Sequence, residues 1–174
     1  MSLLSTEPPP GIAELLIFGY GNPSRGDDAL GPLLIERLEP LLTEALQRQA
    51  GGIECLTDFQ LQVEHAMDLA GRRLVLFADA HVDCPAPWRL APLAAAHDPT
   101  YSTHAISPAA VLRVYEEIKG APPPPSFLLG IRGERFELGD PLSPAAEQHL
   151  AVALTLVREL CQHPTPAGWQ SRCG

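Results

Sequence analysis

Two patterns of hydrophobic and polar positions alternate along the 174-residue chain. Short runs that are almost wholly apolar predict buried strands, and these runs are residues 15–20, 53–58, 73–80 and 126–132. Between them, apolar residues recur at helical spacing and predict helices, namely residues 30–48, 62–70, 107–120 and a last helix that opens at Ser143. The chain therefore alternates strand and helix four times.

This alternation predicts an α/β fold. We expect a three-layer α/β/α sandwich with a mostly parallel, twisted sheet of about five strands, similar to phosphorylase/hydrolase-like proteins. The run WRLAPL within residues 81–101 is the candidate for an added edge strand. Domain organisation is predicted as a flexible leader over 1–13, a single domain over 14–162 and a loose tail over 163–174, which shows no periodicity.

Composition narrows the classes of partner. The formal net charge of −9 argues against nucleic acid and anionic membranes, and favours a neutral, cationic or metal-bearing partner. No apolar run approaches the ~18 residues of a membrane span, and the N-terminus lacks the pattern of a signal peptide. None of the four cysteines lies in a CxxC pair, which argues against a zinc knuckle. We expect a reduced, cytoplasmic protein.

The stretch GYGNPSRGDDALG, residues 19–31, follows the first predicted strand and resembles a phosphate-binding turn. A dinucleotide fingerprint needs Gly-x-Gly-x-x-Gly, but Ser24 breaks the spacing that Gly19 and Gly21 begin, and no Walker A motif is present. Two adjacent carboxylates, Asp27 and Asp28, would also repel a phosphate from the helix N-terminus. The loop therefore argues against nucleotide binding.

Three polar residues are expected to meet at the edge of the sheet where the parallel strands end. Asp28 follows the first strand, Asp79 closes the third, and His104 precedes the helix at 107. Two carboxylates and an imidazole suit a borderline divalent transition metal, and three protein ligands leave coordination positions open. Weaker candidates at the same edge are Asn22, Asp27, Asp58, Gln60 and His81.

Simpler interpretations of these residues stay open on the sequence alone. Asp27 and Asp28 could cap a helix and stabilise its dipole, and Asp79 could be a turn carboxylate, although a carboxylate after so apolar a strand is costly unless paired. Taken alone, His104 is more simply an ordinary loop histidine. The motifs contain no recognisable nucleophile such as Gly-x-Ser-x-Gly, so the catalytic nucleophile is unassigned. His65 and His149 are expected on helix surfaces.

Three stretches resemble the [NiFe]-hydrogenase maturation endopeptidases: FGYGNPSRGDDALG, LVLFADA and STHAISPAAVL. They occur in the family's order across residues 14–160, with FLLGIR as the late strand. The resemblance implies metal-contacting roles for Asp28, Asp79 and His104. It also implies an endopeptidase that recognises nickel already inserted in a hydrogenase large-subunit precursor and removes its C-terminal extension. The nickel, for which other divalent ions could substitute, would belong to the substrate, and the enzyme is expected to be a monomer.

The chain departs from the family pattern in two places. Ala29 stands where many members have glycine, and TDFQLQVEH replaces the Asp-Gly-Gly run that often follows the second strand. Asp58 therefore has no assigned role, and Gln60 is a secondary candidate. An alternative function from another class is a non-hydrolytic nickel-checkpoint or chaperone module that binds the same precursor without cutting it. A third hypothesis, a nucleotide-dependent enzyme, is opposed by the broken glycine spacing.

Overall fold

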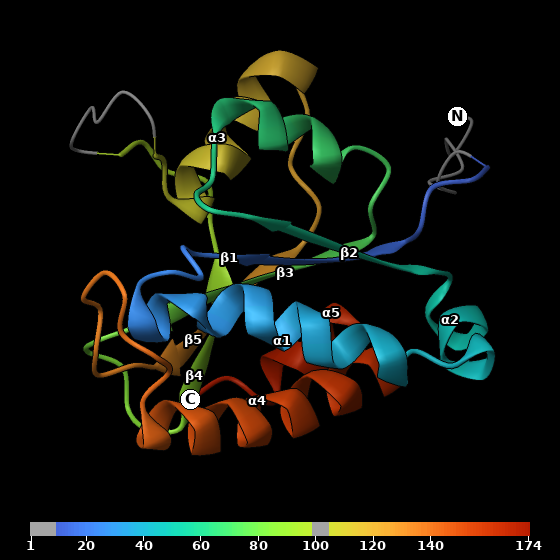
Figure 1. Cartoon of the computed structure of the whole chain (residues 1–174). Helices are drawn as coiled ribbons and strands as arrows, with labels where there is room; N and C mark the ends of the chain where they lie inside the picture. The colour runs from blue at the N-terminus through green and yellow to red at the C-terminus, as the bar shows by residue number, and fades with distance from the viewer. Residues whose placement is uncertain (1–9, 99–104) are drawn as a thin grey trace, which may run out of the picture.

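A single five-stranded sheet organises the part of the chain that the computed structural model describes, residues 10–98 and 105–174 (Figure 1). Its strands lie in the order β2-β1-β3-β5-β4, and only β4, at one edge, runs antiparallel. The bounds are β1 Leu15–Tyr20, β2 Ile53–Asp58, β3 Leu74–His81, β4 Trp88–Leu93 and β5 Ser126–Arg132. The predicted α/β fold is confirmed, including the edge strand within residues 81–101.

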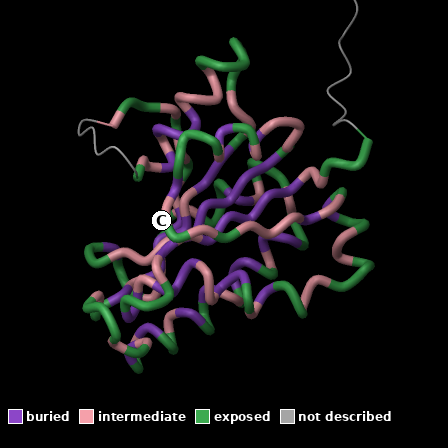
Figure 2. The backbone as a smooth tube through the Cα atoms, turned by 45° about the horizontal axis from the view of Figure 1, so that its top comes forward, coloured by how far each residue is buried: buried purple, intermediate pink, exposed green. Residues whose placement is uncertain are grey.

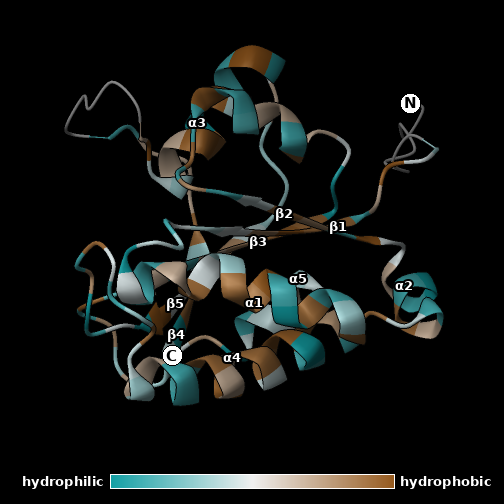
Figure 3. Ribbon diagram, in the orientation of Figure 1, coloured by the Kyte–Doolittle hydropathy of each residue, from teal (hydrophilic) through white to brown (hydrophobic). Residues whose placement is uncertain are grey.

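Helices cover both faces of this sheet (Figure 1). On one face lie α1 (Leu30–Leu38), α2 (Glu44–Ala50), α4 (Pro144–Gln162) and α5 (Pro166–Gln170), and on the other lie α3 (Pro108–Lys119) and the 3-10 helix η3 (Val63–Leu69). The central strands β1, β3 and β5 are largely apolar and are among the most deeply buried segments of the molecule (Figures 2 and 3). In the described ranges, no helix combines the length and the apolar character needed to cross a bilayer.

Side chains along each strand alternate between two hydrophobic cores. In β1, Leu15 and Ile17 pack with the α1 and α4 layer, whereas Leu16 and Phe18 pack with η3 and α3. Phe77 of β3 joins the second core as well. Because the period is two, the residues that follow Phe18 and Phe77 by two positions, Tyr20 and Asp79, lie on the face of the sheet that carries η3 and α3.

The helix predicted over residues 30–48 is broken, and this prediction was wrong in its extent. α1 ends at Leu38, a short 3-10 turn, η2 (Glu39–Leu41), follows, and α2 begins only at Glu44. Pro40 lies in the turn and cannot donate a backbone hydrogen bond to a continuing helix. Thr43 then caps α2 by accepting a hydrogen bond from the Leu46 amide at 3.2 Å.

The predictions for the later helices agree better with the structure. Ser107 and Ser143 cap α3 and α4, each accepting a hydrogen bond of 3.1 Å from the amide three residues later. Gly120 ends α3 in the left-handed conformation, with a φ of 63°. Residues 62–70 do form a helix, but its hydrogen bonding is of the 3-10 type.

The C-terminal tail is ordered, contrary to the prediction of a loose segment. Trp169, in α5, is fully buried; its ring packs edge-to-face on Phe127 at a centroid distance of 5.4 Å, and its Nε1 donates to the Leu160 carbonyl at 2.9 Å. A helix of five residues is too short to show periodicity in the sequence, so the pattern could not reveal it. Most of the predicted leader, residues 1–9, lies outside the described part of the chain.

Replacing Trp169 by alanine should lower the free energy of unfolding by about 3–5 kcal/mol, because a large cavity opens in the core. Urea denaturation followed by circular dichroism measures this change. Ser171→Ala is the matched control, since Ser171 is exposed one residue beyond α5 and its substitution should cost less than about 0.5 kcal/mol. Equal stability of Trp169→Ala and the wild type would show that the tail does not pack as described.

Candidate functional site

The glycines of the 19–31 loop allow close backbone approach rather than phosphate binding. A Cβ atom on Gly31 would lie 2.4 Å from the Tyr20 carbonyl oxygen, and one on Gly21, whose φ is +145°, would lie 2.0 Å from the Asp28 carbonyl oxygen. These contacts bring the 3-10 helix η1 (Gly26–Ala29) directly onto the end of β1. The loop therefore delivers its two aspartates to the carboxyl edge of the sheet.

Asp27 is a structural anchor. Its carboxylate is fully buried and accepts four hydrogen bonds of 2.7–3.0 Å, from the amides of Glu134, Arg135 and Ser143 and from the Ser143 hydroxyl. Burial alone would raise the pKa of Asp27, but these hydrogen bonds outweigh it and lower the pKa. The prediction that Asp27 caps its own helix was wrong in detail, because it instead holds the residue that caps α4.

Asp28 and Asp79 lie close together at the ends of β1 and β3. Asp28 is half-buried and accepts a 2.8 Å hydrogen bond from the Asn22 amide, which holds its carboxylate over the edge. Asp79, also half-buried, accepts a 2.8 Å bond from the Ala80 amide. Burial is the main cause that raises the pKa of Asp79 to about 7, and the negative charge of Asp28 raises it further. These are two of the three residues predicted as metal ligands.

Tyr20 is a site residue that the sequence reasoning missed. Its hydroxyl hydrogen-bonds to Asp79, which lowers the pKa of that carboxyl and holds its orientation. Burial, followed by the charges of Asp79 and Asp28, raises the pKa of Tyr20 well above its ordinary value, so the phenol stays protonated as a donor. The contact depends on strand register, which the sequence does not reveal: Tyr20 and Asp79 each follow the last β1–β3 pair, Gly19 and Ala78.

The pair of carboxylates can do two kinds of chemistry. Two partly desolvated like charges repel each other, and a divalent cation between them relieves that repulsion while accepting their oxygens as ligands. Without a cation, a carboxyl with a pKa of about 7 can accept or release a proton near neutral pH. Both possibilities depend on Asp28 and Asp79 being held together at this edge.

The predicted third ligand, His104, lies outside the described residues. Within residues 10–98 and 105–174, no three His, Cys, Asp or Glu side chains gather into a metal-binding group. The described part of the site therefore consists of two carboxylates and the tyrosine, and a metal site completed by His104 stays a prediction.

Asp58 and His65 form a separate pair at the end of β2. The His65 Nε2 lies 3.2 Å from the Asp58 carboxylate, and the Gln62 amide donates to His65 Nδ1 at 2.9 Å. The ring also packs edge-on against Phe18, at a centroid distance of 4.8 Å, and only 14 % of the side chain is exposed. The surface position expected for His65 was wrong, because η3 turns the ring inward. Gln60 is half-buried in the loop between β2 and η3.

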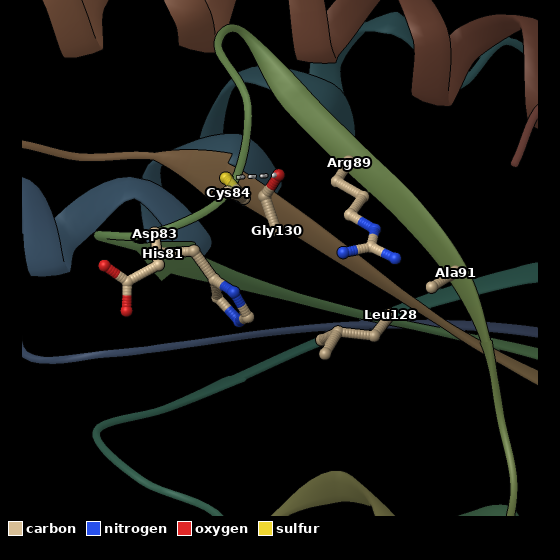
Figure 4. A pocket seen from close by; sticks show the side chains of 7 residues that line it. All are labelled: His81, Asp83, Cys84, Arg89, Ala91, Leu128 and Gly130. Carbon is tan, nitrogen blue, oxygen red and sulfur yellow. Dashed lines mark hydrogen bonds between the residues drawn. The ribbon is translucent and has the colours of Figure 1, made fainter. Parts of the chain in front are cut away.

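The other histidines near this edge have different surroundings. His149, expected on a helix surface, is half-buried, and its Nδ1 lies 2.8 Å from the Arg132 carbonyl oxygen. His81, two residues after Asp79, packs its ring on Gly130 and faces a hollow of about 270 Å³ (Figure 4). Burial lowers the pKa of His81, and the charge of Asp83 acts in the opposite direction. His81 is thus beside the carboxylate pair, without a hydrogen bond to Asp79.

The mostly parallel α/β fold that carries this acidic pair is shared with solved structures of proteases. A hydrogenase maturating endopeptidase, HybD, from Escherichia coli is 27 % identical with a TM-score of 0.62, covering 83 % of this chain and 89 % of that one. An endopeptidase from Escherichia coli is 25 % identical with a TM-score of 0.63, covering 83 % and 89 %. These likenesses define the class of protein, a peptidase.

A third solved structure is similar in the same way. A [NiFe] hydrogenase maturation protease, HycI, from Thermococcus kodakarensis has the same fold, with a TM-score of 0.64 and 24 % identity over 88 % of this chain and 95 % of that one. No protein-family model matches the chain, and no curated protein matches it by sequence. The resemblance to the hydrogenase maturation endopeptidases is confirmed at the level of structure.

Replacing Asp27 by asparagine should lower the free energy of unfolding at pH 7 by about 3 kcal/mol, because an amide turns N–H groups toward donors. The folded-state pKa of Asp27 lies below its ordinary value of about 3.9, so its stabilisation is complete above that pH and is lost as the pH falls through the lower value. The difference between the two proteins should therefore be constant from about pH 5 to 8 and shrink below about pH 4.

Urea denaturation at a series of pH values measures both effects. Asp140→Asn, a half-buried carboxylate in the neighbouring loop, is the control and should change stability little. A difference between Asp27→Asn and the wild type that persists unchanged to pH 2 would contradict the role of the charge.

The pKa of Asp79 should respond in opposite directions to changes in its two neighbours. Asp28→Asn removes a negative charge and should bring the pKa below about 7, whereas Tyr20→Phe removes a hydrogen bond to the carboxylate and should raise it. Carbon-13 NMR titration of the Asp79 carboxyl measures both shifts. An unchanged titration in both variants would show that the three side chains do not interact.

Proposed function

We propose that this protein is an endopeptidase that recognises nickel in a [NiFe]-hydrogenase large-subunit precursor and removes the precursor's C-terminal extension. The observation that carries the proposal is the convergence of Asp28 and Asp79 at the carboxyl edge of the sheet. It is supported by the likeness to the Escherichia coli protein named as a hydrogenase maturating endopeptidase. The nickel ion is part of the substrate, so the metal site is completed only when the precursor binds.

In this proposal the positive charge of the nickel ion balances the negative charges of the two carboxylates. Asp28 and Asp79 would each give a carboxylate oxygen to the ion, and His104 would give an imidazole nitrogen, a donor set that suits a borderline divalent metal. Tyr20 acts through Asp79 by holding its carboxyl in place. The net charge of −9 favours the approach of a cationic centre over long range.

Holding the ion also positions the peptide to be cut. An ion gripped by both the precursor and this edge fixes the neighbouring peptide bond against the sheet, so that positioning supplies a large share of the rate. Hydrolysis then adds water across that bond: the hydroxyl joins the carbonyl carbon, the C–N bond breaks, and the departing nitrogen takes up a proton. A metal in such a site can polarise the carbonyl or activate the water.

The proposal predicts that cleavage depends on nickel and on the three ligands. Wild-type protein incubated with nickel-loaded precursor should release the extension, whereas Asp28→Ala, Asp79→Ala and His104→Ala should each reduce the rate by at least about 100-fold, because the bond is no longer positioned. Mass spectrometry of the precursor measures the loss, and thermal unfolding checks that each variant folds. Glu117→Ala, exposed on α3, is the control and should cleave normally.

Two outcomes would overturn this proposal. Binding of the loaded precursor by the wild type without any mass loss would instead indicate a non-hydrolytic checkpoint module. Normal cleavage by all three ligand variants would show that the metal-recognising site lies elsewhere.

A further inference from the structure

A hollow of about 270 Å³ lies over strands β4 and β5 (Figure 4). We call it the Arg89 groove, and it is lined by His81, Asp83, Cys84, Arg89, Ala91, Leu128 and Gly130. Its floor is formed by β5 and the edge strand β4, where Ala91 pairs with Leu128. The groove is thus a shallow space over the sheet with an apolar floor and charged groups at its sides.

Strand register connects this groove to the site. Asp79 of β3 pairs with Gly130 of β5, and Gly130 pairs with Arg89 of β4, so the three residues form one row across the sheet. Residues paired in this way project to the same face, and neighbouring strands are about 4.8 Å apart, which places the Arg89 backbone about 10 Å from that of Asp79. Gly130, in the middle of the row, has no side chain, and the ring of His81 packs on it there.

Arg89 is exposed and unpaired among the described residues, as expected of a side chain that binds an anion. Its side chain is exposed and extends from β4 over the sheet, as Figure 4 shows, and it forms no ion pair with any described residue. Asp83 lines the same groove, but its carboxylate is directed away from Arg89 (Figure 4). Burial raises the pKa of Cys84, and the charges of Arg132 and, to a smaller extent, Arg89 act in the opposite direction. An exposed guanidinium without an ion-pair partner among the described residues favours a carboxylate ligand.

We propose that the Arg89 groove binds the precursor's C-terminal extension, and that Arg89 pairs with a carboxylate of that extension about three residues beyond the cleaved bond. This inference rests on the proposed function, which places the cleaved bond beside Asp79. An extended peptide advances about 3.3 Å per residue, so three residues cover the ~10 Å from Asp79 to Arg89. The apolar floor at Ala91 and Leu128 accepts the intervening side chains, and the peptide backbone passes over the ring of His81, which packs on Gly130.

The test compares Arg89→Ala and Arg89→Glu with the wild type, using the nickel-loaded large-subunit precursor as substrate. Both variants should raise KM about tenfold or more, because a charge-assisted hydrogen bond is lost, while kcat changes little. Arg89→Lys keeps the charge and should retain part of the affinity. Arg48→Ala is the matched control, since Arg48 is an exposed arginine on α2, away from the groove, and its KM should equal that of the wild type.

Altered substrates identify the carboxylate. Each acidic residue of the extension is changed to lysine in turn, which gives a series of precursors. One of them, in which the partner of Arg89 is the changed residue, should be processed better by Arg89→Glu than by the wild type. If the terminal carboxylate is the ligand instead, no such position is found, and a precursor with one added C-terminal residue shows the raised KM. Equal KM values for the wild type and both Arg89 variants would overturn the proposal while leaving the proposed protease function intact.

A direct binding measurement separates the two proposals. A fluorescent synthetic peptide with the extension's sequence, titrated into the full protein, should bind the wild type more tightly than Arg89→Ala in an anisotropy assay. If the wild type binds this peptide in an Arg89-dependent way but never cleaves the precursor, the proposed function fails and the groove assignment stands. Equal binding by the wild type and Arg89→Ala would overturn the groove assignment.

Discussion

The four hydrogen bonds of the buried Asp27 carboxylate are the interaction on which the site depends. They join three segments that are far apart in sequence: the glycine loop after β1, the backbone at Glu134 and Arg135, and the Ser143 cap of α4. A buried charge is stable only when its hydrogen-bonding capacity is used, so this carboxylate leaves the loop little freedom. Asp28 is the next residue, and its place at the edge of the sheet follows from the anchoring of Asp27.

The carboxylates of Asp27 and Asp79 have pKa values shifted in opposite directions, and their roles differ accordingly. Asp27 is surrounded by donors, and its pKa is lowered, so it stabilises the folded chain as a permanent anion. Asp79 is partly desolvated next to Asp28, and its pKa is raised to about 7, so its charge is held at a cost. A raised carboxyl pKa caused by burial and a neighbouring negative charge is typical of functional sites, where a bound ion or substrate can offset the repulsion. The protein thus keeps a stable anchor one residue away from a reactive pair.

Glycines determine the shape of the site as much as the acids do. Gly21 and Gly31 let the loop and α1 approach the end of β1, which brings Asp28 toward Asp79. Gly130 has a different effect, because it lets the ring of His81 pack against the sheet between Asp79 and Arg89, in a row across three strands. The acidic pair and the Arg89 groove are therefore parts of one face, and the backbones of Asp79 and Arg89 are about 10 Å apart.

Local sequence determined the strands, the capped helices α3 and α4, and the presence of Asp28 and Asp79 at strand ends. Apolar runs and cap residues act within a few positions of themselves, so their consequences can be predicted from the chain alone. The break in the helix at Pro40 could also have been predicted from the sequence, because proline has no backbone N–H to donate to a continuing helix. The order of the strands in the sheet could not be predicted in this way. The alternation of strands and helices was nevertheless enough to predict that the carboxyl ends of the parallel strands would lie at one edge of the sheet.

Only the tertiary structure decided the remaining features, because each depends on contacts between distant residues. The anchoring role of Asp27 requires Ser143, which is 116 positions away, and the burial of Trp169 requires Phe127. Tyr20 and Arg89 gained their meaning from strand register, which places them in line with Asp79 although nothing in their own neighbourhood marks them. The sequence thus determined which groups the edge of the sheet carries, and the packing of the chain decided which of them are anchored, which repel and which face open space.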